Sequence, residues 1–286
     1  MKFGVNTLLW TAAFDTTHLS LLPQIKQWGF DGIEIARFDF TGFPASQIRR
    51  AAADEGLECT FCSALTGRLS LISNDSAERR AAREFLARGA EVAAELGAEV
   101  FVGPFCAPVG QLVGRRRTAD EWKRVVEGLT SLGAALDSTG VMLAIEPLNR
   151  FETFFLNTAA DAARLCDEVG HPRIGALLDS FHANIEEKTI AEAVETLGPR
   201  IRHVHACEND RGIPGTGHVD WPALFTALRR AGYNGWIVIE SFGFAIPEIA
   251  AAACIWRDIA PNPEAIASEG IRFLRAAERA AGATAA

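Results

Sequence analysis

The feature that most constrains the fold is an alternation of short apolar segments with helical segments, repeated eight times along the chain. The apolar segments have the length and composition of buried strands, and the stretches between them show helical periodicity. Eight strand–helix repeats over 286 residues are typical of a (β/α)8 TIM barrel of the α/β class. The expected strands span Phe3–Trp10, Gly32–Ala36, Glu58–Ala64, Glu99–Phe105, Met142–Leu148, Ile174–Phe181, Ile201–Cys207 and Trp236–Phe242.

Local signals mark where the helices begin and end. Helical periodicity is clear over Ala77–Leu96 and Glu121–Leu136. Asp75-Ser-Ala-Glu78 and Thr118-Ala-Asp-Glu121 resemble capping boxes, which satisfy free backbone N–H groups at a helix start. Glycines that suit helix ends stand at Gly56, Gly97, Gly170 and Gly232.

The chain reads as one barrel domain over residues 1–286, with an Ala-rich tail at 277–286, because no linker or low-complexity block divides it. The alternative is a doubly wound open sheet. It is disfavoured because no G-x-G-x-x-G motif follows the first strand.

Composition excludes several classes of function. The net charge of −8, from 28 basic and 36 acidic residues, argues against a nucleic-acid partner. No apolar run reaches the roughly 18 residues that a membrane span needs. Six cysteines in a chain of this length fit buried free thiols in a cytoplasmic protein better than a disulfide framework. Cys59 and Cys62 should face opposite sides of their strand, so a shared metal is not expected.

Four consecutive expected strands end in residues that can bind a metal, and in a parallel barrel the chemistry lies at these carboxyl ends. They are Glu146, Asp179, His205 and Glu240. Burying so many carboxylates costs several kcal/mol each unless a cation compensates them. An oxygen-rich set with one imidazole favours Mn²⁺, with Co²⁺ or Mg²⁺ as alternatives, and zinc stays open.

Further polar residues surround this set. His203 lies one pleat deeper than His205 and is expected to be a packed or supporting histidine, while the role of Glu34 is open. The glycine-rich loop Gly212–Gly217 matches no phosphate-binding motif and contains no lysine. A phosphate cradle is therefore the weaker interpretation, and Arg211 is expected to bind substrate oxygens instead.

Four motifs in this order give the chain its resemblance to a known family. They are EPLNRFETFFLNT at 146–158, LLDSFHANIEE at 177–187, HVHACENDRGIPGTGHVDW at 203–221 and IVIESF at 237–242. Over most of its length the chain resembles the ketose 3-epimerases, the D-tagatose and D-allulose (D-psicose) 3-epimerases of the xylose-isomerase-like barrels.

The resemblance implies a Mn²⁺ or Co²⁺ site formed by the four strand-end residues, with Glu146 and Glu240 as acid/base catalysts. It also implies that Glu152, His182 and Arg211 contact the hydroxyls and carbonyl end of a ketose, and that the protein is a homodimer or homotetramer. No organic cofactor is expected. Inversion at C3 would proceed by proton transfer between two glutamates through a metal-stabilised enediolate.

Several points stay open at this level. Trp10, Phe105 and Phe242 are candidates for an apolar wall beside the sugar. The loop 107–117 is a candidate for shaping the far end of the pocket or a subunit contact, and its basic run Val113–Arg117 is expected to be a solvated turn. The alternative function is an aldose–ketose isomerase of the same superfamily, of the hydroxypyruvate or rhamnose type. A nuclease of a related barrel, or a sugar-binding regulatory protein, is less favoured.

Overall fold

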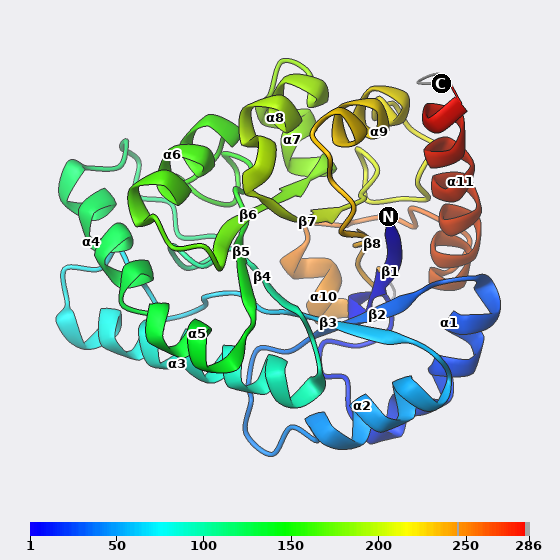
Figure 1. Ribbon diagram of the computed structural model, residues 1–286, viewed down its shortest axis with the longest axis horizontal. Coiled ribbons are helices and arrows are strands. Elements are labelled where there is room, and N and C mark those ends of the chain that lie inside the picture. The colour runs from blue at the N-terminus through cyan, green and yellow to red at the C-terminus, as the bar shows by residue number, and fades with distance from the viewer. Residues whose placement is uncertain (245, 284–286) are drawn as a thin grey trace.

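The strands of the protein form a closed parallel barrel, and the helices surround it (Figure 1). The computed structural model describes residues 1–244 and 246–283. Each strand pairs with the next one in the chain, and β8 pairs with β1. The predicted (β/α)8 fold is therefore confirmed, and the open doubly wound sheet is excluded. The strands are β1 Lys2–Asn6, β2 Gly32–Ala36, β3 Glu58–Cys62, β4 Val100–Gly103, β5 Met142–Ile145, β6 Ile174–Asp179, β7 Ile201–His205 and β8 Trp236–Ile239.

The helical segments connect the strands, and most of them lie on the outside of the barrel (Figure 1). The 3₁₀ helices are η1 Thr7–Leu9, η2 Thr16–Leu21 and η3 Gly198–Arg200. The α-helices are α1 Leu22–Trp28, α2 Ala45–Asp54, α3 Ser76–Leu96, α4 Ala119–Thr130, α5 Gly133–Thr139, α6 Ala159–Val169, α7 Ser180–Glu186, α8 Ile190–Leu197, α9 Trp221–Arg230, α10 Pro247–Ala252 and α11 Pro263–Ala283. By contrast with the outer helices, η1 and α10 contact the apolar cluster inside the barrel.

The first strand is shorter than the apolar run that predicted it. The side chain of Asn6 accepts a hydrogen bond from the backbone N–H of Leu8 at 2.9 Å and so caps the 3₁₀ helix η1. This local bond competes with continued extended structure. The segment from Thr7 onward therefore turns over the end of the barrel instead of extending the strand to Trp10.

The predicted helix Glu121–Leu136 is two helices. The capping box at its start is confirmed, because Thr118 Oγ1 accepts from Glu121 N at 3.2 Å and Glu121 Oε2 accepts from Thr118 N at 2.7 Å. Helix α4 then ends at Thr130, where the Ser131 hydroxyl bonds the Gly128 carbonyl oxygen at 2.6 Å. At the other predicted box, Asp75 caps α3 but Glu78 pairs with Ser73 and Arg68 rather than with backbone.

Apolar side chains fill both the layer between strands and helices and the inside of the barrel. Cys59 packs in the outer layer and Cys62 inside, which confirms that they face opposite ways. All six cysteines are free, and Cys254 differs from the expectation because it is exposed. The inside of the barrel is thus filled by apolar residues such as Val102, Leu177 and Trp236.

Helix α11 packs against α9 and α1 and completes the outer ring (Figure 1). The alanine-rich segment predicted as a tail at 277–286 continues this helix as far as Ala283, and residues 284–286 lie outside the described part of the chain. Among the described helices, none combines the length and hydropathy that crossing a membrane requires.

Candidate active site

The four predicted ligands converge at the carboxyl ends of β5 to β8. Glu146 and Glu240 directly follow β5 and β8, while Asp179 and His205 are paired in register at the ends of β6 and β7. All four are buried, and their ligand atoms lie within 4.8 Å of one another. The parallel register therefore brings together residues that are far apart in the sequence.

The electrostatics of this cluster fit a bound cation. Within the described chain, His205 Nδ1 and Glu146 Oε1 are buried without a hydrogen-bond partner, and they lie 3.9 Å apart. His205 Nδ1 also lies 3.4 Å from Glu240 Oε2. Burial, together with the charge of Glu240, raises the pKa of the Glu146 carboxyl well above its ordinary value. A divalent cation among these atoms would satisfy both orphaned atoms and relieve the repulsion between the carboxylates.

Arg211 reaches into the cluster rather than standing at an exposed loop. Its Nη1 donates to Asp179 Oδ2 at 2.9 Å and to Glu240 Oε2 at 3.1 Å. The guanidinium packs on the rings of Phe181 and Phe242, 4.0 and 4.9 Å from their centroids. Its charge holds the pKa of Asp179 well below the usual range, although burial acts in the opposite direction. Arg211 thus has donors and a fixed orientation suited to an oxygen-rich ligand.

His182 and Glu152 lie beside Arg211 and share a partner that the sequence did not single out. Asn149 donates from its backbone N–H to His182 Nδ1 at 3.1 Å. Its side-chain amide donates to Glu152 Oε1 at 2.8 Å. The opposite ring nitrogen of His182 lies 3.2 Å from Arg211 Nη2 and 3.6 Å from Glu146 Oε1. Asn149 therefore ties both predicted substrate-binding residues to one turn after β5.

A cavity of about 320 Å³ opens over these groups. Its lining combines polar and apolar side chains. The charged and polar residues include Glu146, Glu152, His182, Arg211 and Glu240. The apolar residues include Leu8, Phe38, Val109, Leu148 and Phe242. A lining of this composition suits a small ligand that has hydroxyls as well as apolar parts.

Of the predicted aromatic wall, only Phe242 lines the cavity. Trp10 is directed elsewhere: its ring stacks on Trp28 with centroids 6.2 Å apart, and its Nε1 donates to Glu264 Oε1 at 3.2 Å. Phe105 is fully buried against Phe101. The cause is the turn at η1, which brings Leu8 instead of Trp10 over the mouth.

The basic run of the loop 107–117 is exposed from Val113 to Arg116, as expected of a solvated turn, and it is anchored at Arg117. Arg117 forms a bidentate pair with Asp161 at 2.6 and 2.8 Å and donates to the Phe155 carbonyl oxygen at 2.7 Å. Val109 contributes to the cavity wall, and Gly110 N donates to the Glu152 carbonyl oxygen at 2.8 Å. The loop therefore helps to shape the pocket, which is one of the two roles expected for it. The other role, a subunit contact, stays a prediction.

The glycine-rich loop wraps around Glu208, a buried residue just after β7. Glu208 Oε2 accepts from Gly215 N at 2.7 Å and Trp221 Nε1 at 3.1 Å, and Oε1 accepts from Asn209 N and Val219 N, both at 3.1 Å. A Cβ atom at Gly217 would lie 2.6 Å from Glu208 Oε1, so this position needs glycine.

These contacts give the glycines of the loop a structural purpose. The carboxylate of Glu208 accepts from Gly215 N and that of Asp210 from Gly212 N, so these N–H groups are already taken. Asp220 caps α9 through the backbone N–H of Ala223 at 3.0 Å. The loop therefore carries Arg211, whose φ of 64° is uncommon for a residue other than glycine. Its glycines are used for close packing and not for binding an anion.

Comparison with known proteins defines the class first. Residues 22–277 match the model of the xylose isomerase-like TIM barrel family. This range includes strands β2 to β8, so the match agrees with the closed barrel. The chain belongs to this family.

Within the family the chain falls among the ketose 3-epimerases, as the sequence motifs predicted. It is 39% identical to a probable ketose 3-epimerase from Synechocystis over 275 residues, which are 96% of each chain. Its structure is similar to that of an L-ribulose 3-epimerase, with a TM-score of 0.94, 29% identity, and 99% and 96% of the two chains covered. A D-allulose 3-epimerase from Methylomonas sp., solved with D-allulose, gives a TM-score of 0.91 at 26% identity over 96% of each chain. At the level of family, the predicted enzyme class of carbohydrate epimerase is confirmed.

Proposed function

We propose that this protein epimerises free ketoses at C3, with Glu146 and Glu240 as the two residues that exchange the proton. The observation that carries the proposal is the placement of two buried carboxylates, which directly follow β5 and β8, in the lining of one cavity. Epimerisation requires removal of a proton next to a carbonyl and its return from the opposite face. Two carboxylates serve this better than one, because a single base tends to return the proton where it came from.

Glu146, Asp179, His205 and Glu240 would hold a divalent metal, for which Mn²⁺ is the first candidate and Co²⁺ or Mg²⁺ are alternatives. When bound, such a cation would stabilise the negative charge that develops on the sugar oxygens during proton removal. Two observations support the proposal: the buried ligand atoms of His205 and Glu146 that have no hydrogen-bond partner, and the burial and repulsion from Glu240 that raise the pKa of Glu146. The scheme needs no organic cofactor.

The remaining polar residues would hold the sugar. Arg211 would donate hydrogen bonds to its oxygens from a guanidinium already fixed between two phenylalanine rings. His182 and Glu152 would bind the hydroxyls and the carbonyl end, in orientations set by Asn149. Phe242 and the other apolar residues of the lining would pack against the apolar parts of the sugar and limit access of water to the reacting carbon.

A panel of ketoses tests the function directly. D-fructose, D-tagatose and D-ribulose are each incubated with Mn²⁺-loaded protein in deuterated water, and the products are identified by NMR. We expect C3 epimers with deuterium at C3, and no turnover after treatment with EDTA until metal is restored. An aldose product with deuterium at C2 and no C3 epimer would instead establish the alternative, an aldose–ketose isomerase. Sugar binding without any exchange would contradict both enzymes.

We also propose that the protein is a homo-oligomer, a dimer or tetramer, in a reducing, cytoplasmic compartment. Phe151 and Trp256 support the first part, since they are 71% and 77% exposed and line the same groove beside the cavity. The six free cysteines support the second. Light scattering of the purified protein measures the subunit number, and a mass of one chain would contradict the first part.

A further inference from the structure

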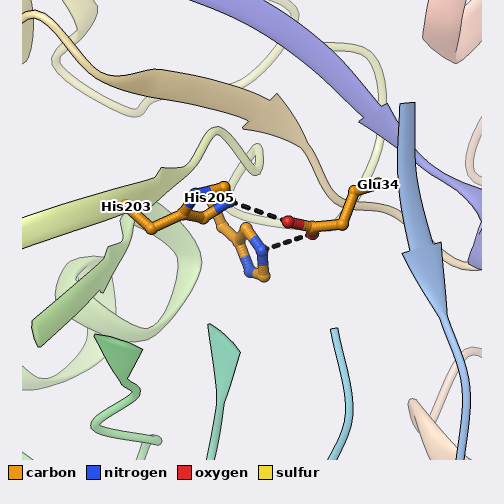
Figure 2. Close-up of side chains that lie close together, drawn as sticks. All are labelled: Glu34, His203 and His205. Atoms are coloured by element: carbon orange, nitrogen blue, oxygen red, sulfur yellow. Dashed lines mark hydrogen bonds and ion pairs between the residues drawn. The ribbon is translucent and has the colours of Figure 1, made fainter. Parts of the chain in front are cut away.

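Three buried polar residues, Glu34, His203 and His205, lie close together (Figure 2), and His205 is also one of the proposed metal ligands. Glu34 on β2 reaches toward His203 and His205 on β7, and all three side chains are fully buried. Glu34 and His203 line no part of the cavity, so the proposed reaction does not use them directly. A charged group placed this deep in a barrel needs a reason, because its burial is costly.

The carboxylate of Glu34 is surrounded by donors on both oxygens. Oε1 accepts from Asn6 Nδ2 at 2.9 Å and lies 2.8 Å from His205 Nε2, with hydrogen-bond geometry. Oε2 accepts from Thr60 Oγ1 at 2.9 Å. His203 Nε2 lies 2.8 Å from the same oxygen, close enough for an ion pair but not aligned for a hydrogen bond.

These contacts determine which nitrogen of His205 carries a proton toward Glu34. Both oxygens of Glu34 already accept a hydrogen bond from another side chain, Oε1 from Asn6 and Oε2 from Thr60, which is the arrangement of an ionised carboxylate. An ionised carboxylate only accepts hydrogen bonds. His205 Nε2 must therefore donate, which leaves Nδ1 as the nitrogen that can bind a metal. Nδ1 is the atom that faces Glu240 and Glu146.

We propose that Glu34 is a positioning residue, which holds the Nε2 proton of His205 and so directs Nδ1 at the metal. The proposal rests on the proposed function in one respect, that His205 is a ligand. His203 contributes by packing edge-on against His205, with ring centroids 5.2 Å apart and an interplanar angle of 83°. This contact opposes rotation of the His205 ring away from the site.

The trio could in principle bind a second ion of its own, since its ligand atoms also lie within 4.8 Å of one another. The donors around Glu34 argue against this. Asn6, Thr60 and His205 already occupy three lone-pair directions of the carboxylate, and the ring of His203 closes the fourth side. A cation would have to displace these donors, so we expect one ion per chain.

Calorimetric titration with Mn²⁺ tests the proposal on Glu34→Gln and on a matched control. The amide of glutamine presents a donor where an acceptor is needed, so we expect the Kd for Mn²⁺ to rise 10- to 100-fold. At saturating Mn²⁺ the kcat should return to within a few-fold of the unaltered protein. The control is Glu121→Gln, which removes a buried glutamate that caps α4 outside the barrel. Its Kd should not change.

An unchanged Kd in folded Glu34→Gln, or two Mn²⁺ ions per unaltered chain, would overturn the proposal. If Glu34→Gln does not fold, nitrogen NMR of the Zn²⁺-loaded unaltered protein decides instead. We expect the metal on Nδ1 of His205 and a proton on Nε2, and metal on Nε2 would overturn the proposal.

The failure of this proposal can be told apart from the failure of the proposed function. Tight Mn²⁺ binding without ketose epimerisation would contradict only the proposed function. Epimerisation with an unchanged Kd in Glu34→Gln would sink only the role of Glu34.

Discussion

Glu146 and Glu208 are both buried glutamates that follow strands at the same end of the barrel, yet their surroundings differ. The two oxygens of Glu208 accept four hydrogen bonds from the loop that wraps around it. Glu146 Oε1 is buried with no donor among the described residues, and burial together with a second carboxylate, Glu240, raises the pKa of Glu146. A buried carboxylate whose hydrogen bonds are all formed stabilises the fold. A buried carboxylate that has no donor and lies beside a like charge indicates a site for a ligand.

The largest expected effect is the loss of turnover in Glu146→Gln. The amide cannot exchange a proton, so kcat should fall by about 10³-fold or more. The free energy of unfolding of the metal-free protein should stay equal or increase, because the substitution removes a buried charge beside Glu240. Steady-state kinetics and urea unfolding measure the two quantities. A variant that keeps a tenth of the activity would show that Glu146 is not one of the two bases.

Arg211→Ala tests whether the buried guanidinium beside Glu240 serves substrate binding or metal binding. Removing a charged donor costs about 1.5 to 3 kcal/mol, which corresponds to a roughly 10- to 100-fold loss in kcat/KM. The Kd for Mn²⁺ should change much less, because Arg211 is a donor and not a metal ligand. A larger effect on Mn²⁺ binding than on kcat/KM would mean that the guanidinium serves mainly to arrange the ligands.

Glu208→Gln should give the opposite pattern to Glu146→Gln. Each carboxylate oxygen of Glu208 accepts hydrogen bonds from two donors, and in the variant an amide nitrogen would face two of these donors. The free energy of unfolding should therefore fall by about 2 to 4 kcal/mol. In the folded fraction kcat should remain, and KM should rise because the loop that carries Arg211 is loosened. An unaltered urea midpoint would contradict the role of Glu208 as the organiser of the loop.

Much of the fold and of the site could be predicted along the chain. The repeated strand–helix pattern determined the barrel, because each periodicity reflects which face of an element is buried. The positions of Glu146, Asp179, His205 and Glu240 after four consecutive strands determined that they would meet, since parallel strands end at one edge. Strand and helix ends were less predictable: side chains such as those of Asn6 and Ser131 form local hydrogen bonds that end an element early.

The sequence by itself determined the barrel, the converging carboxylates and the resemblance to the ketose 3-epimerases. Only the tertiary structure decided which polar groups are satisfied, because partners such as Glu34 and His205 are 171 positions apart in the chain. For the same reason, only the tertiary structure shows that Trp10 points away from the cavity and that Arg211 is buried beside it. It also shows that the glycine-rich loop packs around Glu208. Hydrogen bonds and burial depend on distances in space, and a pattern along the chain does not contain them.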